Sequence, residues 1–101
     1  MPKLYEYFGL RVCFYANEHE PVHAHEFYQG RESRAELVIE NGLIAGIRIL
    51  PVAGVLPLKG KALADFKRLV SRRAEDIVRK WIEFFVHHRQ IETEIITRKL
   101  K

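Results

Sequence analysis

Residues 32–50 read ESRAELVIENGLIAGIRIL, two runs of alternating polar and apolar side chains on either side of Asn41-Gly42. Alternation with a period of two is typical of β-strands, and Asn-Gly between two such runs is a strong hairpin signal. The stretch therefore predicts two antiparallel strands, over residues 32–40 and 43–50.

The register of this hairpin follows from which face becomes apolar. A two-residue turn would set Glu36 opposite Ile47 and mix charged with apolar groups. A three-residue loop over 40–42 avoids this mixture because it makes one face wholly apolar, so we expect that loop. The expected pairs are Ile39 with Leu43, Leu37 with Ala45 and Ala35 with Ile47.

The rest of the first half of the chain shows the same kind of pattern. Runs rich in aromatic and β-branched residues cover 5–8, 10–16 and 22–28, and Gly9 and Gly30 stand in the turns between them. Together with the hairpin they predict an antiparallel meander of about five strands within residues 1–50.

The second half of the chain changes to a helical pattern. Residues 51–60 contain Pro and Gly and predict a connector, and residues 61–90 repeat apolar side chains every three or four positions. Because Arg73 falls on the apolar side, we expect a break near Ser71, giving one kinked or two C-terminal helices over one face of the sheet. Residues 91–98 predict a final strand, and the fold class is α+β.

Composition places the chain among ordinary globular proteins. It has 101 residues, with 48% hydrophobic and 30% charged side chains, which predicts one domain over 1–101. No apolar run approaches the ~20 residues that span a bilayer, and the first residues lack the pattern of a signal peptide. The single Cys13 excludes an intrachain disulfide. We therefore expect a cytoplasmic location and no membrane partner.

Positive charge is concentrated in the last part of the sequence. The net charge is +4, and residues 59–101 carry twelve basic and six acidic side chains. Such an excess is compatible with RNA or DNA as a partner, because Lys and Arg release counterions from phosphates. Many of these charges are also spaced for ion pairs along a solvated helix face.

Three of the five histidines lie within residues 19–25, which read HEPVHAH. If the hairpin pairing is carried back through the Gln29-Gly30 turn, His23 faces Glu36 and His25 faces Arg34. One sheet face should then collect a polar group of side chains, which we call the histidine face: Cys13, Tyr15, His23, His25, Arg34, Glu36 and Arg48. The opposite face should hold Phe14, Ala24, Leu37 and Ile39 beneath Phe66, Ile77 and Trp81.

The histidine face allows three kinds of chemistry. His23 and His25 could act as general acid and base in a metal-free ribonuclease, supported by Arg34 and Glu36. Alternatively His19, His23 and His25 could bind zinc and leave a fourth position open; no other cofactor is expected. In the third interpretation the imidazoles stabilise a turn and form hydrogen bonds to Glu36 and Tyr15.

The motif around these histidines resembles a known family. Residues 7–10, which read YFGL, and residues 14–25, which read FYANEHEPVHAH, look like small bacterial proteins of unknown function with an N-D/E-H-x-P-P-H-x-H core. Lys80-Trp81-Ile82 is similar to the late helix of that family, and Val22 replaces the second Pro. The resemblance implies a gene beside that of a second small protein, in an arrangement similar to toxin-antitoxin pairs.

These observations lead to one hypothesis and two alternatives. The hypothesis is a member of a toxin-antitoxin-like pair that binds or cleaves RNA through the histidine face, with a second small protein as partner. The alternatives are a non-catalytic protein-interaction domain and a His-ligated metal-binding protein. Trp81, Phe84 and Phe85 are expected in the core, or in a homodimer contact if the apolar arc of the helix is too wide for the sheet to cover.

Overall fold

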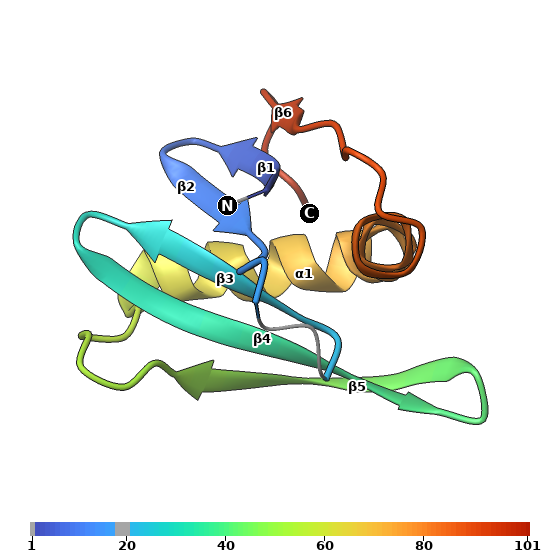
Figure 1. The fold of residues 1–101 in the computed structure, drawn as a ribbon. Coiled ribbons are helices and arrows are strands. Elements are labelled where there is room, and N and C mark those ends of the chain that lie inside the picture. Colours follow the sequence, from blue (N-terminus) through green and yellow to red (C-terminus); the bar gives the residue numbers. More distant parts are fainter. Residues whose placement is uncertain (1, 18–20) are drawn as a thin grey trace.

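The computed structural model describes residues 2–17 and 21–101, and these form the predicted α+β fold (Figure 1). Their six-stranded sheet has the order β5-β4-β3-β2-β1-β6, with the antiparallel meander from β1 to β5. The strands are β1 Lys3–Tyr7, β2 Leu10–Cys13, β3 His23–Tyr28, β4 Arg31–Glu40, β5 Leu43–Pro51 and β6 Glu94–Ile96.

The register expected for the β4–β5 hairpin is wrong. Glu40 pairs with Leu43, so the turn has two residues, and both of them have positive φ: 52° at Asn41 and 79° at Gly42. These dihedral angles are those of a tight hairpin turn whose twist matches the strands. The register then shifts at a β-bulge, where Ala45 has no directly opposite residue in β4.

The bulge achieves the separation of faces that the three-residue loop was expected to provide. Beyond it Leu37 pairs with Ile47, and Glu36 pairs with Arg48. Apolar side chains therefore meet apolar ones on one face, and opposite charges meet on the other. Leu43, expected on the apolar face, is 72% exposed at the tip of the hairpin.

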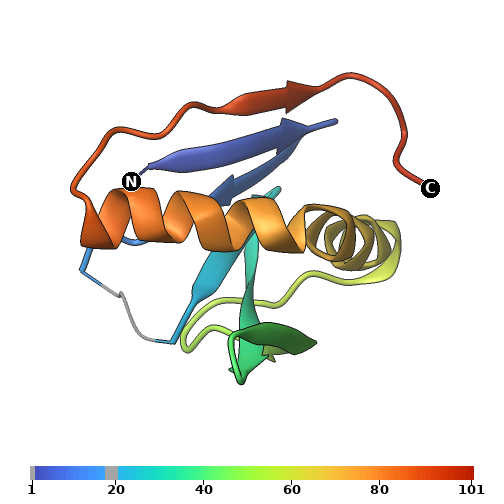
Figure 2. The same cartoon turned by 90° about the vertical axis from the view of Figure 1, so that its right-hand side faces the viewer.

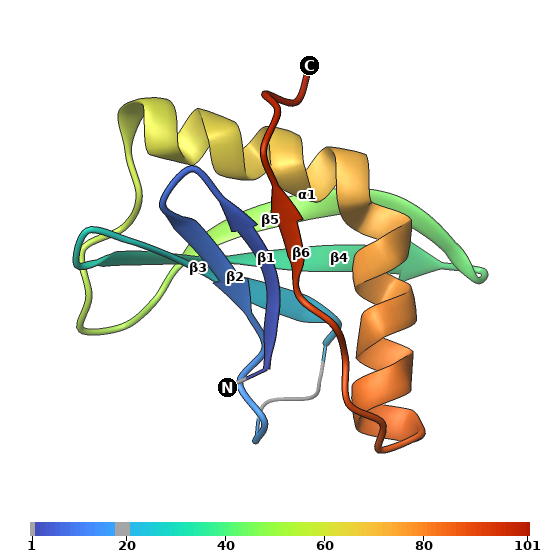
Figure 3. The ribbon, with the colours of Figure 1, turned by 90° about the horizontal axis from the view of Figure 1, so that it is seen from above.

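One continuous helix covers the apolar face. α1 spans Gly60–Trp81 and continues as a π-helical turn, η1, over Ile82–Val86. Figures 2 and 3 show that α1 bends sharply part-way along, as the ribbon passes from yellow to orange. The expected kink is therefore present. Arg73, the charged residue on the apolar side, forms two hydrogen bonds of 3.0 Å with Glu94 of β6.

The last strand returns to the sheet as expected, but its direction was not predicted. β6 pairs with β1 in parallel, with Glu6 opposite Ile95. Lys80 of α1 holds this edge together, since its ammonium group donates to the carbonyl oxygens of Leu4 at 3.3 Å and of Glu92 at 3.0 Å. Its side chain is 8% exposed, so these bonds replace the water that the charge has lost.

The core lies between the sheet and α1. Phe14, Ala24 and Leu37 are buried with Phe66 and Ile77, as predicted. Ile39 was expected there but is 41% exposed, because the hairpin extends beyond the end of the helix in the view of Figure 1. No helix in the described part of the chain is long and apolar enough to cross a membrane.

Two glycines of the hairpin provide a matched test of this geometry. A Cβ at Gly42 or at Gly46 would meet no atom within 4 Å, but only Gly42 has a positive φ, of 79°. We expect Gly42→Ala to lower the free energy of unfolding by about 1 kcal/mol, because an L-residue is strained in the left-handed region. Gly46→Ala should leave it unchanged or raise it slightly. Urea denaturation measures both variants, and equal losses would contradict the observed turn.

Candidate functional site

The strand pairings bring the predicted polar side chains together. His23 lies opposite Glu36, and His25 lies opposite Arg34. On the other side of β3, Cys13 lies opposite His25. These pairings confirm the register predicted for β2, β3 and β4, and they place both imidazoles on the face that α1 does not cover.

Glu32 of β4 is the central acceptor of this cluster. His25 Nδ1 donates to Glu32 Oε2 at 2.8 Å, and the Tyr15 hydroxyl donates to the same oxygen at 2.5 Å. The Tyr15 ring also stacks on the imidazole of His25, with centroids 3.9 Å apart. The carboxylate thus orients His25 and ties the segment after β2 to the sheet, which makes Glu32, His25 and Tyr15 one unit.

Glu32 was missed by the sequence analysis, which expected Glu36 as the acceptor. Glu36 instead forms ion pairs with Arg34 at 2.9 Å and with Arg48 at 3.7 Å. Glu32 is not directly opposite His25 but is its diagonal neighbour, two residues from Arg34 along β4. Alternation along β4 puts residues 32, 34 and 36 on the same face, so the signal was available.

Both imidazoles are buried and oriented. His23 Nδ1 lies 2.6 Å from the carbonyl oxygen of Pro21, and because a carbonyl only accepts, this nitrogen carries the proton. His23 is 3% exposed and His25 2% exposed. A general acid or base must come within about 2.6–3.2 Å of the proton it transfers. A bulky substrate does not reach these rings in this conformation, so the catalytic roles of His23, His25, Arg34 and Glu36 stay predictions.

The zinc hypothesis depends on His19, which lies outside the described residues. Within 2–17 and 21–101, no three His, Cys, Asp or Glu side chains are grouped to hold a metal ion. His23 and His25 each donate through Nδ1 to a fixed oxygen, as histidines in metal sites also do. Binding through His19, His23 and His25 stays a prediction, and elemental analysis of untagged protein tests it.

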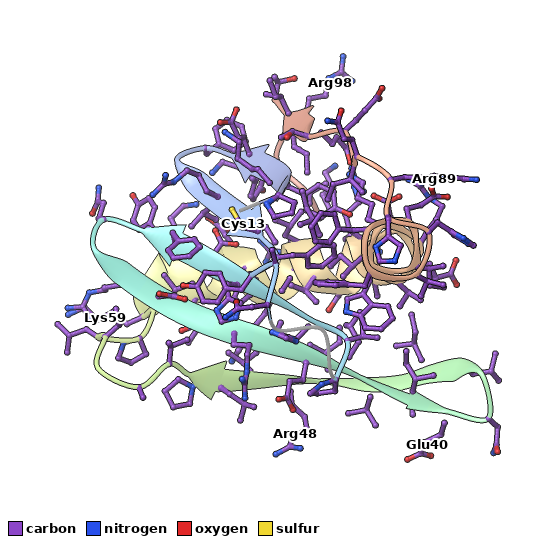
Figure 4. The ribbon with its side chains drawn as sticks, in the orientation of Figure 1. Cys13, Glu40, Arg48, Lys59, Arg89 and Arg98 are labelled. Carbon is purple, nitrogen blue, oxygen red and sulfur yellow. The ribbon has the colours of Figure 1, made fainter. Side chains whose placement is uncertain are left out.

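Cys13 is a packed side chain of the same region. Figure 4 shows it on β2, and it is 6% exposed. Burial raises the pKa of its thiol, so the reactive thiolate is disfavoured. Cys13 therefore behaves as a small packed apolar residue.

A second buried acid lies on the other face of β3. Glu26 is completely buried, and neither of its carboxyl oxygens has a hydrogen-bond partner among the described residues. Burial, and to a smaller extent the charge of Asp65, raise its pKa from 4.5 to about 9. At neutral pH the folded protein therefore holds Glu26 in the protonated form.

Comparison with known proteins identifies the family. A family model described as "Domain of unknown function (DUF4160)" matches residues 9–82, which include β2 to β5 and α1. This chain belongs to the DUF4160 family. No curated protein and no solved structure matches it. The expected membership of a domain family of unknown function is confirmed, whereas the family's histidine motif and its gene arrangement stay predictions.

Glu32 and Glu36, on the same face of β4, differ in what they support. Glu32→Gln should lower the free energy of unfolding by about 2 kcal/mol, because it removes a buried charged acceptor shared by two donors. Glu36→Gln is the matched control, and it should cost less than about 1 kcal/mol because its arginine partners are partly exposed. Denaturant unfolding of both variants checks this. A larger loss for Glu36→Gln would show that Glu32 is not the central acceptor.

The raised pKa of Glu26 makes stability depend on pH. Between 4.5 and about 9 the folded state keeps the Glu26 proton while the unfolded chain releases it, so folding takes up a proton. The free energy of unfolding should therefore fall as pH rises through this window. Glu26→Gln should remove that slope and be more stable than the parent by more than about 1 kcal/mol at about pH 8. The exposed Glu75→Gln is the control, and an unchanged slope in Glu26→Gln would contradict the assignment.

Proposed function

We propose that this DUF4160 protein is a non-catalytic interaction domain that binds an extended segment of a second small protein at the outer edge of β5. The observation that supports this most directly is a long sheet edge that no described strand covers. The burial of the histidines supports it too, since His23 and His25 then serve to hold the structure together.

β5 is the longer of the two edge strands. It has nine residues and stands at one end of the strand order, whereas β6 at the other end has only three. An edge strand presents unpaired N–H and C=O groups along its outer side, and an extended peptide can complete these bonds as an added strand. The β5 edge is therefore the better template for such pairing.

The side chains around this edge favour a protein partner. Leu43 is 72% exposed and Ile39 41% exposed, and both belong to the hairpin that projects from the sheet in Figure 1. Natural edges are commonly protected by charged side chains, but Arg48 is the only charged residue of β5. The bulge at Ala45 and the terminal Pro51 protect parts of this edge, and the apolar stretch between them is typical of a surface that a partner covers.

The positive charge of this protein indicates which side chains its partner carries. Figure 4 shows Arg48 pointing away from the sheet below β5, and its side chain is 63% exposed with Glu36 at 3.7 Å. The chain as a whole has a net charge of +4. We therefore expect an extended segment in which apolar residues alternate with polar ones and an acidic residue lies near Arg48. Its source is the second small protein that the family resemblance implies.

Co-expression with the product of the adjacent gene tests this proposal. We expect a stable complex in which the backbone amides of β5 become protected from hydrogen exchange, while those of β6 do not change. Leu43→Lys should weaken the complex about tenfold or more, because it puts a charge into the apolar contact.

Leu56→Lys is the matched control. Leu56 is 64% exposed but lies in the connector after β5, so its replacement should leave the affinity within about twofold. The proposal fails if no complex forms, if protection falls on another strand, or if self-association alone protects β5. It also fails if the protein binds and cleaves RNA, and His23→Gln abolishes that cleavage without unfolding the protein.

A further inference from the structure

A cavity of about 360 Å³ lies at the start of α1, between the β1–β2 and β3–β4 turns. This volume is within the range of small-molecule sites. The side chains that matter for its chemistry are four cations and two aromatic residues: Arg31, Lys59, Lys61, Lys99, Phe8 and Tyr28.

The cations make the cavity strongly positive. The described lining has four cationic side chains and one carboxylate, that of Asp65, which lies 2.7 Å from Lys61 Nζ. Asp65 is also shared with Arg68 at 3.7 Å, so it does not neutralise the group. Lys61 lies close enough to Lys99 to lower the pKa of the Lys99 ammonium group. Lys61 and Lys99 both line the cavity, and an anion bound between them relieves the repulsion of two like charges.

The aromatic residues form the other part of the lining. Phe8 is 50% exposed, and Lys99 Nζ lies 4.5 Å from the centroid of its ring. Phe8 has a φ of 48° at the β1–β2 turn, beside Gly9 at 88°. A Cβ on Gly9 would lie 3.2 Å from the Tyr28 ring, so the turn packs closely against Tyr28. The turn therefore presents an exposed ring beside the cations.

We propose that this cavity binds a nucleotide, with the phosphate group held by Lys61 and Lys99 and the base placed against Phe8. Ammonium groups bind phosphate through short charge-assisted hydrogen bonds, and bases stack on aromatic rings. The positive end of the α1 dipole adds to the same field. The site shares no residue with the β5 edge, so it does not depend on the proposed protein partner.

Titration of the full-length ¹⁵N-labelled protein with adenosine monophosphate tests the proposal by NMR. We expect saturable shifts of the amides of Phe8, Lys61 and Lys99, with inorganic phosphate and adenosine each binding about tenfold more weakly. Lys61→Gln and Lys99→Gln should each reduce the affinity about tenfold. Asp65→Asn should increase it, because that change removes the only carboxylate among the described residues that line the cavity.

Lys67→Gln is the control for general electrostatics. Lys67 is exposed on α1 but does not line the cavity, so at constant ionic strength its replacement should change the affinity by less than about twofold. The proposal is overturned by an absence of saturable shifts, or by equal losses in Lys67→Gln and Lys61→Gln. It is also overturned if inorganic phosphate binds as tightly as the nucleotide, since the base then contributes nothing.

Discussion

The antiparallel pairing of β3 with β4 is the constraint on which both faces of the sheet depend. Ala24 opposite Ala35 faces α1, while His25 opposite Arg34 faces away from it. Because side chains alternate along a strand, a slip of one residue would put the imidazoles into the apolar core. The hydrogen bond from His25 to Glu32 then reinforces the register, since it forms only when these two strands are aligned in this way.

The sequence could predict this pairing because two independent patterns agree. Short turns at Gln29-Gly30 and Asn41-Gly42 limit the register to a few choices, and the apolar positions select among them. The β4–β5 hairpin, whose predicted register was wrong, shows the limit of alternation as a signal. A three-residue loop and a two-residue turn followed by a bulge both separate charged from apolar side chains, so alternation does not distinguish them. The bulge lies at Ala45, and alanine is not a residue type that marks a bulge in a sequence.

Features that depend on contacts between distant segments were harder to foresee. β-rich composition predicted a strand after the helix, but its parallel pairing with β1 joins segments that are far apart in the sequence. Arg73 binds Glu94, and Tyr5 of β1 donates to Asp76 of α1 at 2.6 Å. The cavity at the start of α1 also depends on distant segments. Phe8 and Lys99 are ninety-one positions apart in the sequence and contact each other in the fold.

The two proposed surfaces are formed by different elements, the outer edge of β5 and the turns beside the start of α1. In Figure 4, Lys59 beside the cavity and Glu40 at the hairpin tip stand at opposite sides of the molecule. No residue of the cavity lining belongs to β5, so a partner strand on the outer edge of β5 uses none of the groups that line the cavity. Two segments connect the two surfaces: β4, which begins at Arg31 in the cavity lining and ends at the hairpin, and the connector that runs from Pro51 of β5 to Lys59. Because β4 is paired with β3 on one side and with β5 on the other, it is the stiffer of these two connections.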